Sequence, residues 1–274
     1  MKLLNIGCGS TYHPAWVNID VEPVSQEIIR YDVRKPLPFE GSSFDACYCS
    51  HVLEHLSSEE ALLLLIEIHR VLKPGGIIRV VVPDLEGIIR AYLTTLELAL
   101  SAKEGAEYFY DWIVLELIDQ MVRTKSCGQM GEFLKNCPVG ARGFILARIG
   151  NEAEKFWGNE QRKGCKLSQL SGKPTRCFIN KIRFLLVCCF AWLWGGKRGV
   201  RSVKEGWFRT SGEVHRWMYD KFSLGRVLEK AGFSNVVVCA PSVSRIPGFI
   251  SYGLDVINGE VRKPDSLFME GFHP

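Results

Sequence analysis

The residues best suited to bind a ligand near the start of the chain are two glycines and an acid that follow short apolar runs. Gly7, Cys8 and Gly9 come directly after the run at 2–6, and Asp20 closes the next run. A glycine turn lets the backbone approach a ligand closely and offers its N–H groups to a polar or anionic group. A carboxylate at the end of the neighbouring strand can accept both hydroxyls of a ribose. This arrangement favours a nucleotide-like ligand.

A dinucleotide-binding dehydrogenase is disfavoured by the same stretch. Its G-x-G-x-x-G fingerprint needs a third glycine where Tyr12 stands, and the acid comes sooner than the usual ~20 residues. Residues 10–15 also leave too little room for a full helix before the next strand.

A second cluster, His51-Val52-Leu53-Glu54-His55, has the form H-x-x-E-H. A zinc protease with this motif needs both histidines on one helical face, a third ligand and an activated water. Here the motif begins at the expected end of a strand, which disfavours a protease. We predict no metal site, and we expect His55 to pack against the sheet or to line the ligand pocket.

Strands that alternate with helices must position these residues. Six strands are expected, at residues 2–6, 16–21, 44–49, 77–82, 235–239 and 266–270. One helix should start at Ser57 or Ser58 and stop at the Lys-Pro-Gly-Gly of 73–76, and a later helix should cover 222–231. The alternation predicts an α/β fold with a parallel, doubly wound sheet.

The charge balance reverses in the middle of the chain. Residues 121–209 hold 18 Lys and Arg but only 5 Asp and Glu. The remainder of the chain holds 16 Lys and Arg and 25 Asp and Glu. The eleven residues 184–194 (FLLVCCFAWLW) form an apolar run with basic flanks. With the helical pattern over 85–120, these features predict a helical, basic insertion after the fourth or fifth strand.

The insertion admits three interpretations. It could bind nucleic acid through its charge, with Trp157, Phe178 and Trp207 for stacking. It could lie on an anionic membrane surface through 184–194. It could also be a substrate lid whose apolar run is buried core. We favour the lid, keep membrane contact second and nucleic acid last, and exclude a span because eleven helical residues cover only ~16 Å.

Several motifs in order resemble the class I S-adenosylmethionine-dependent methyltransferases, of the group known as methyltransferase type 11. Residues 3–9 (LLNIGCG) resemble the first motif of that family, and 17–22 (VNIDVE) resemble its acidic second-strand end. Residues 32–49 (DVRKPLPFEGSSFDACYC) match its D-x-x-x-x-LPF-x-x-x-SFD pattern. Residues 50–56 (SHVLEHL) and 70–76 (RVLKPGG) resemble its later signatures.

The resemblance covers residues 3–86, and 215–238 look like the family's late helix and strand. It implies a Rossmann-like, seven-stranded methyltransferase sheet that binds S-adenosylmethionine. The sheet domain would consist of residues 1–104 and 213–274, on either side of an insertion at 105–212.

The resemblance also implies roles in cofactor binding. Gly7 and Gly9 would let the turn pass under the methionine portion, and Asp20 would hold the ribose hydroxyls. The link to Asp20 is short, so the first family helix should be truncated or absent. The implied cofactor-binding residues are Asn5, Gly7, Cys8, Gly9, Asp20, Asp32, Val33, Ser50 and His51.

The remaining implied roles concern adenine and the methyl group. Asp32, with the backbone of Val33, would accept from the adenine amino group, and Ser50 and His51 would line the methionyl side. Asn5 replaces the acid that many family members have, so its contact with the cofactor's amino group would be lost or water-mediated. A Mg²⁺ site of the form E-x-x-E-H, known in some methyltransferases, is disfavoured because His51 replaces the first glutamate.

The activity implied is methyl transfer to a hydroxyl of a glycan, a lipid-linked sugar or a small molecule. His215 would be the general base that takes the hydroxyl proton. The competing interpretation is structural, with Trp217 and Tyr219 as core anchors and His215 as the cap of the following helix. The alternative function is a catalytically inactive cofactor-binding adaptor that uses its basic segment on a membrane or on RNA.

The composition excludes several other classes. With 11% aromatic residues and a mean hydropathy of +0.04, the 274 residues supply enough apolar surface for a folded core. No run reaches the ~18 apolar residues of a membrane span, and no secretory signal is visible. Ten cysteines without a C-x-x-C pair indicate buried, reduced thiols. We therefore expect a cytoplasmic protein, with the inner membrane face as the alternative location and the oligomeric state open.

Overall fold

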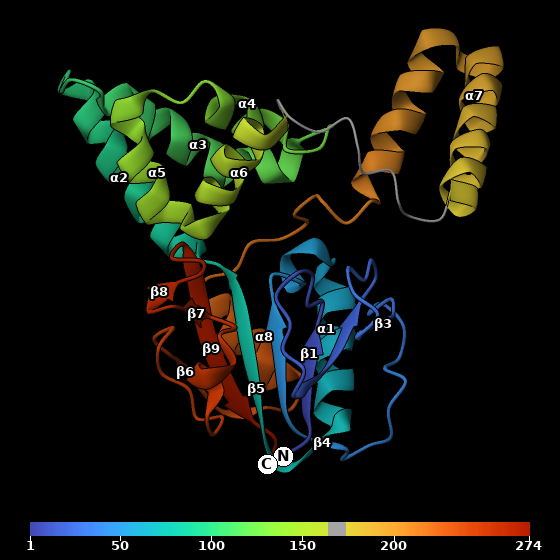
Figure 1. The fold of residues 1–274 in the computed structure, drawn as a ribbon, viewed down its shortest axis with the longest axis vertical. Helices are drawn as coiled ribbons and strands as arrows, with labels where there is room; N and C mark the ends of the chain where they lie inside the picture. Colours follow the sequence, from blue (N-terminus) through green and yellow to red (C-terminus); the bar gives the residue numbers. More distant parts are fainter. Residues whose placement is uncertain (164–173) are drawn as a thin grey trace.

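The computed structural model describes residues 1–163 and 174–274. Its centre is a seven-stranded sheet of order β3-β2-β1-β4-β5-β9-β6 (Figure 1). Its strands are β1 (Leu3–Ile6), β2 (Trp16–Asp20), β3 (Ile28–Arg30), β4 (Phe44–Ser50), β5 (Leu72–Pro83), β6 (Ser234–Val238) and β9 (Ser266–Phe272). The first five are parallel, and β9 runs antiparallel to both β5 and β6. The predicted seven-stranded α/β sheet is confirmed, and β3 is the strand that the sequence pattern missed.

The helix that follows β4 has the predicted start. It is α1 (Ser58–Val71), and Ser57 caps it: the Ser57 hydroxyl accepts from the Glu60 N–H at 3.2 Å, and the Glu60 carboxylate accepts from the Ser57 N–H at 2.8 Å. Such a reciprocal pair satisfies two N–H groups that a helix end leaves free. The Lys-Pro-Gly-Gly of 73–76 belongs to β5, which therefore begins at Leu72, earlier than predicted.

The two faces of the sheet are covered differently. On one face α1 and α8 (Lys221–Lys230) pack over a core that includes Leu4, Cys47 and Val80. The opposite face holds the alternate residues of the same strands. It is covered by the segment 240–265, which contains the short η2 helix (Phe249–Tyr252) and the hairpin of β7 (Val256–Ile257) with β8 (Glu260–Val261). No helix lies between β1 and β2 in this described stretch, as the short link predicted.

A buried ion cluster fastens the covering segment to the sheet. Arg79 of β5 is fully buried and contacts Asp255 at 2.7 Å and Glu270 of β9 at 2.8 Å. Its guanidinium also donates to backbone carbonyls of Ala240 and Val243. Because every partner is also removed from water, the cluster depends on all of its members being present.

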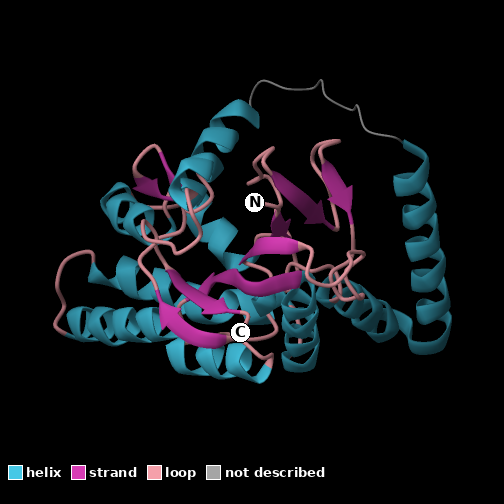
Figure 2. Ribbon diagram, turned by 90° about the horizontal axis from the view of Figure 1, so that it is seen from below, coloured by secondary structure: helices cyan, strands magenta, loops and turns pink. Residues whose placement is uncertain are grey.

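The insertion leaves the sheet after the fifth strand. Its helices are α2 (Leu85–Leu100), α3 (Ala106–Val122), α4 (Gly128–Lys135), α5 (Val139–Ile149), α6 (Asn151–Lys163) and α7 (Pro174–Arg209). Helices α2 to α6 have their own core, with Trp112, Ala141 and Ile145 fully buried. Figure 2 shows the strands in the centre of the molecule with helices around them. The domain boundaries at 104 and 212 stay a prediction.

The prediction that the apolar run 184–194 is buried core is wrong. Leu185 is 62% exposed, Phe190 66% and Trp194 94%. The backbone of α7 breaks at Gly196, and its two arms lie side by side, with Phe184 and Trp207 in edge contact at 5.1 Å between ring centroids (Figure 1). No helix within the described residues is long and apolar enough to cross a membrane.

Two further expectations for side chains need correction. Trp157 is half-buried, its indole N–H donates to the Leu134 carbonyl, and the Arg142 guanidinium lies over its ring, so this ring face is not free for base stacking. The side chain of Phe178 lies outside the described residues. Among the thiols, Cys127 and Cys189 are exposed rather than buried.

Candidate functional site

The turn after β1 has the geometry that its glycines allow. Gly7 and Gly9 both have left-handed φ angles, +63° and +53°. The N–H groups of Gly7 and Cys8 donate to the Ile19 carbonyl at 2.9 and 3.2 Å, which joins the turn to the end of β2. A Cβ on Gly7 would overlap the Cγ2 methyl of Val52. Only glycine fits this place, and the backbone there borders a cavity.

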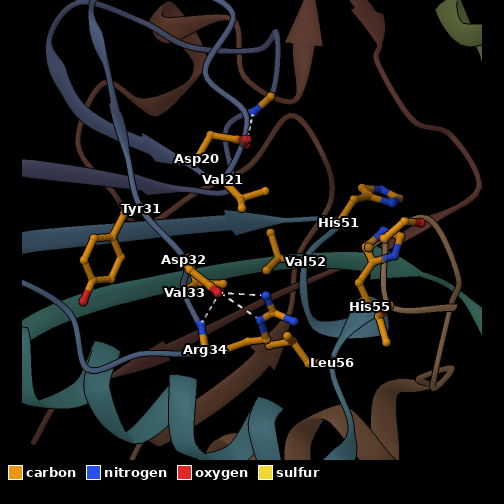
Figure 3. A pocket seen from close by; sticks show the side chains of 15 residues that line it. Asp20, Val21, Tyr31, Asp32, Val33, Arg34, His51, Val52, His55 and Leu56 are labelled. Atoms are coloured by element: carbon orange, nitrogen blue, oxygen red, sulfur yellow. Dashed lines mark hydrogen bonds and ion pairs between the residues drawn. The ribbon is translucent and has the colours of Figure 1, made fainter. Parts of the chain in front are cut away.

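Asp20 ends β2 beside this turn. Its Oδ2 accepts from the Gly9 N–H at 2.8 Å (Figure 3). Its Oδ1 accepts from the Glu22 N–H, also at 2.8 Å. A carboxylate has about four lone-pair positions, so both oxygens can accept a further hydroxyl. Burial, and after it the charge of this carboxylate, raises the pKa of the Cys8 thiol to about 12, which keeps that thiol neutral.

Six of the predicted cofactor residues line one cavity of about 360 Å³ at the carboxyl ends of β1, β2 and β4 (Figure 3). Its lining consists of Gly7, Gly9, Asp20, Val21, Tyr31, Asp32, Val33, Arg34, His51, Val52, His55, Leu56, Thr210, Ser211 and Gly212. The other three predicted residues, Asn5, Cys8 and Ser50, border an adjoining cavity of about 180 Å³ that shares Gly7, Gly9 and His51. The sequence motifs therefore converge on one region.

Asp32 is held in place by a neighbour that the sequence analysis did not select. Arg34 forms a two-pronged ion pair with it, Nε to Oδ1 at 2.9 Å and Nη2 to Oδ2 at 2.8 Å. The hydrogen bond from this guanidinium lowers the pKa of Asp32 below its ordinary value. The carboxylate is thus ionised, and a ligand amino group would share it with Arg34.

Asn5 and Ser50 are engaged inside the protein. The Asn5 amide is buried and donates to the Thr11 carbonyl at 3.1 Å and to Oδ1 of Asn18 at 3.0 Å. The Ser50 hydroxyl accepts from Arg262 at 2.8 Å. Both side chains stabilise the loops around the cavity in addition to bordering it.

His51 stands at the end of β4 in the left-handed region, with φ +54°. Such a backbone is uncommon for a residue with a side chain and is concentrated at functional sites. Its Nε2 lies 3.0 Å from the Ser266 hydroxyl and its Nδ1 lies 3.0 Å from Oε1 of Glu54. Burial holds the pKa of His51 well below its ordinary value, so the ring is neutral.

His55 and His215 meet although 160 positions separate them in the sequence. His55 ends the short helix η1 (Leu53–His55), and its ring meets that of His215 edge to face, with centroids 4.8 Å apart. Burial is the main reason why the pKa of His55 is lowered and that of His215 falls to about 2. His55 lines the ligand cavity, which was one of the two places that the sequence led us to expect for it.

The structural interpretation of the 215–219 segment is wrong in two respects. The cap of α8 is Asp220, whose carboxylate accepts from the Ser223 N–H at 2.7 Å, and not His215. Trp217 is 47% exposed and anchors no core, whereas Tyr219 is buried.

His215 lines a second cavity, of about 470 Å³, between the sheet edge and the insertion helices. The two cavities share His51, His55 and Gly212. Further residues of the second cavity are Pro83, Gln120, Arg123, Cys127, Met130, Gly131, Leu134, Ile149, Glu152, Phe156, Glu213, His215, Lys263 and Asp265. A molecule in the second cavity would therefore lie next to one in the first.

Some lining residues carried no usable sequence signal. Thr210, Ser211 and Gly212 follow α7 far along the chain and reach the first cavity because the chain returns there from the insertion. Lys263 and Asp265 lie just before β9, outside any motif. Arg34 could have been found, because it lies two residues after Asp32 within the motif itself.

Comparison with known proteins agrees with the motif order. Residues 4–80 match a family described as "Methyltransferase domain", which is less than a third of the chain. This match confirms the resemblance to class I methyltransferases for that segment and supports S-adenosylmethionine as the methyl donor. No curated protein matches the chain significantly.

Solved structures give likenesses of two kinds. The [4+2]-cyclase SpnF is 30% identical over 29% of this chain and 38% of its own length, with a TM-score of 0.25. S-adenosylmethionine-dependent methyltransferases from Thermotoga maritima and Archaeoglobus fulgidus are each 12% identical. The alignment with the Thermotoga protein covers 100% of this chain and 82% of that protein, with a TM-score of 0.37. The alignment with the Archaeoglobus protein covers 99% of this chain and 86% of that protein, with a TM-score of 0.38. The chain thus spans well under half of the length of the cyclase.

Proposed function

We propose that this chain, whose residues 4–80 belong to the methyltransferase-domain family, transfers the methyl group of S-adenosylmethionine to a hydroxyl oxygen. The acceptor would be a glycan, a lipid-linked sugar or a small molecule. The observation that carries the proposal is the pair of adjoining cavities that share His51 and His55. One has the glycines and carboxylates that suit a nucleoside, and the other opens beside it under the insertion helices.

The residues of the first cavity fit the methyl donor. The backbone of Gly7 borders the first cavity, where a ligand can approach it, and Asp20 keeps acceptor positions for ribose hydroxyls. Asp32, kept ionised by Arg34, would accept from the adenine amino group. When bound, the donor supplies an activated methyl group on a sulfonium. The chain then needs to hold the two reactants in line and exclude water.

The second cavity suits an acceptor rich in hydroxyls. Gln120, Glu152, Lys263 and Asp265 supply amide, carboxylate and ammonium groups that pair with hydroxyls in either direction. In the reaction the acceptor oxygen forms a bond to the methyl carbon, the carbon–sulfur bond breaks, and its electron pair stays on sulfur. The hydroxyl proton must leave, and His215, with its pKa near 2, takes up a proton poorly. We therefore assign the rate mainly to proximity and orientation.

Transfer of labelled methyl groups tests this activity. Protein incubated with methyl-labelled S-adenosylmethionine and a panel of saccharides, lipid-linked sugars and small hydroxyl compounds should label one class of acceptor and release S-adenosylhomocysteine in equal amount. Labelling that falls on nitrogen or carbon of the acceptor contradicts the hydroxyl assignment. Donor binding without turnover on any acceptor favours the adaptor function instead.

A second function, contact with an anionic membrane surface, is favoured by the exposed arms of α7. The arm before Gly196 exposes apolar side chains, including Trp192 at 60% and Leu193 at 70%. The shorter arm after Gly196 exposes basic side chains. These are Lys197, Arg198, Arg201, Lys204 and Arg209.

This combination matches the interface of an anionic bilayer better than it matches another protein. An apolar helix face enters the boundary between headgroups and acyl chains, and each nearby Lys or Arg adds about 1 kcal/mol on an anionic leaflet. Figure 1 shows α7 standing apart from the sheet and the other helices. A membrane-bound hairpin would bring a lipid-linked acceptor close to the second cavity.

Vesicle flotation tests whether a membrane or a second copy of the chain covers the exposed apolar arm of α7. The protein should float with vesicles of phosphatidylcholine and phosphatidylserine but not with phosphatidylcholine alone. Replacing both Leu193 and Trp194 with Glu should abolish flotation, while Leu63→Glu, at an exposed apolar residue of α1, should not. Wild-type protein that stays unbound with anionic vesicles overturns this proposal. A dimer in solution that the double variant disrupts would show that a second copy covers the face.

A further inference from the structure

Three side chains of the two histidine-containing segments approach one another like ligands of one metal ion. Potential ligand atoms of Glu54, His55 and His215 all lie within 4.8 Å of one another. Two imidazoles and one carboxylate are a set found at catalytic zinc sites, which keep a further position open. A zinc ion about 2.1 Å from each ligand would draw the ligand atoms to about 3.4 Å from one another, so binding would move these side chains closer together.

Glu54 is the second, independent observation. Its side chain is fully buried, and neither carboxylate oxygen accepts a hydrogen bond, although Nδ1 of His51 lies 3.0 Å from Oε1. Buried carboxyl groups without partners are rare, because removal from water is costly unless something replaces it. A cation between Glu54 and the two imidazoles would replace it.

The backbone brings the third ligand to the motif. The Glu54 carbonyl accepts from the N–H groups of Arg216 at 2.6 Å and Trp217 at 3.2 Å, and the His215 N–H donates to the Gln120 carbonyl at 2.9 Å. These bonds hold His215 beside η1 without using its ring. The ring nitrogens of His215 therefore stay available for a ligand.

The surroundings orient the ligands as metal sites commonly do. Nδ1 of His55 lies 3.3 Å from the Val214 carbonyl, so while that hydrogen bond persists the ring can bind a metal only through Nε2. Two cations border the neighbouring cavity, but each has an anionic partner. Lys263 contacts Glu152 at 2.6 Å, and Arg123 contacts Asp119 at 3.4 Å.

We propose that Glu54, His55 and His215 bind a divalent transition-metal ion of the zinc class. This replaces the expectation from the sequence that the chain has no metal site. That expectation rested on the position of the motif at a strand end and on His51 in place of a glutamate, and it considered no ligand from residue 215. His215 supplies a third ligand from a segment far away in the sequence. His51, the first histidine of H-x-x-E-H, lies outside the three and supports Glu54 from the side.

The site deepens the proposed function, on which this part of the inference rests. His55 and His215 both line the second cavity, so the ion would lie at the place assigned to the acceptor. An ion with an open position can hold an acceptor oxygen and lower the pKa of its hydroxyl. The proton would then pass to water, which removes the need for a strongly basic side chain.

Calorimetric titration with Zn²⁺, on protein without a histidine tag and stripped with a chelator, tests the site directly. The proposal predicts one ion per chain. His215→Ala and Glu54→Gln should each weaken binding at least about 100-fold, because even loss of an outer partner of a metal ligand costs 10–100-fold. Co²⁺ should give the absorption of a tetrahedral or five-coordinate site, and that absorption should vanish in both variants.

The control is His273→Ala, near the C-terminus and away from both cavities, which should bind Zn²⁺ like the wild type. Titration with S-adenosylhomocysteine on the same samples reports the first cavity separately and shows that the variants are folded. Absence of Zn²⁺ binding, or binding that both variants retain, overturns the metal site even if the donor still binds. Loss of donor binding in the wild type would instead contradict the proposed function.

Discussion

Gly7 comes directly after the first strand, β1, and its backbone borders the ligand cavity. Its φ of +63° and the nearby Val52 methyl exclude a side chain. We predict that Gly7→Ala lowers the free energy of unfolding by about 1–2 kcal/mol, the typical penalty for a left-handed non-glycine residue, and weakens donor binding. Urea unfolding and calorimetry would measure the two effects.

A matched control for that substitution is Gly140→Ala. Gly140 lies in α5, has no atom within 4 Å of an added Cβ, and has an ordinary φ angle. Alanine there should be neutral or stabilise by up to about 1 kcal/mol, since it favours a helix over glycine. Equal losses in the two variants would show that Gly7 has no special constraint.

At the scale of single residues, the sequence predicted the site residues that belong to short, continuous motifs. Gly7 follows β1 and Asp20 ends β2, so the common edge of a parallel sheet brings them together, as predicted. Asp32 comes after β3, which the pattern missed, and the family resemblance alone implied its place in the cavity.

Glu54 and His55 were singled out but set aside as metal ligands, because their motif begins at a strand end and has His51 in place of a glutamate. Their third partner comes from residue 215, which the sequence does not place beside them. Only the folded backbone shows that contact, through the bonds that the Glu54 carbonyl accepts.

Among the elements, β5 carries the most demanding interaction of the described sheet. Arg79 is fully buried against Asp255 and Glu270. We predict that Arg79→Met lowers the free energy of unfolding by about 3–5 kcal/mol, because two carboxylates lose their cation while still out of water. Chemical unfolding of the variant would measure this loss.

Arg90→Ala serves as the comparison for Arg79→Met. Arg90 is highly exposed and pairs with Glu86 one helical turn away in α2, so its removal should cost about 0.5 kcal/mol or less. A similar small loss for Arg79→Met would contradict the view that the ion cluster fastens the segment 240–265 to the sheet.

The elements that the sequence pattern missed have physical reasons. The strand β3 is three residues long, and two of its three side chains are exposed, so it carries no apolar pattern. The Lys-Pro-Gly-Gly of 73–76 has turn composition but extends β5 to Leu72. The run 184–194 is apolar enough for a core, and composition alone cannot show that its side chains are exposed among the residues that the structure describes.

The whole molecule divides by charge and by exposure. The sheet domain with α2 and α3 is acidic, whereas the segment 121–209 has 18 basic and 5 acidic residues and ends in the exposed arms of α7. The first cavity lies at the carboxyl edge of the sheet, and the second lies where the insertion meets that edge. This arrangement would place the donor on the sheet and let the insertion determine the acceptor.

The central claim is that the first cavity binds S-adenosylmethionine. Calorimetric titration with S-adenosylhomocysteine should show one site in the wild-type protein. Asp20→Asn should bind about 10-fold more weakly or worse, because the charged partner of the ribose hydroxyls is lost. Glu22→Gln, an exposed neighbour, should bind like the wild type. Folded wild-type protein that does not bind, or equal affinity in all three proteins, would contradict the account.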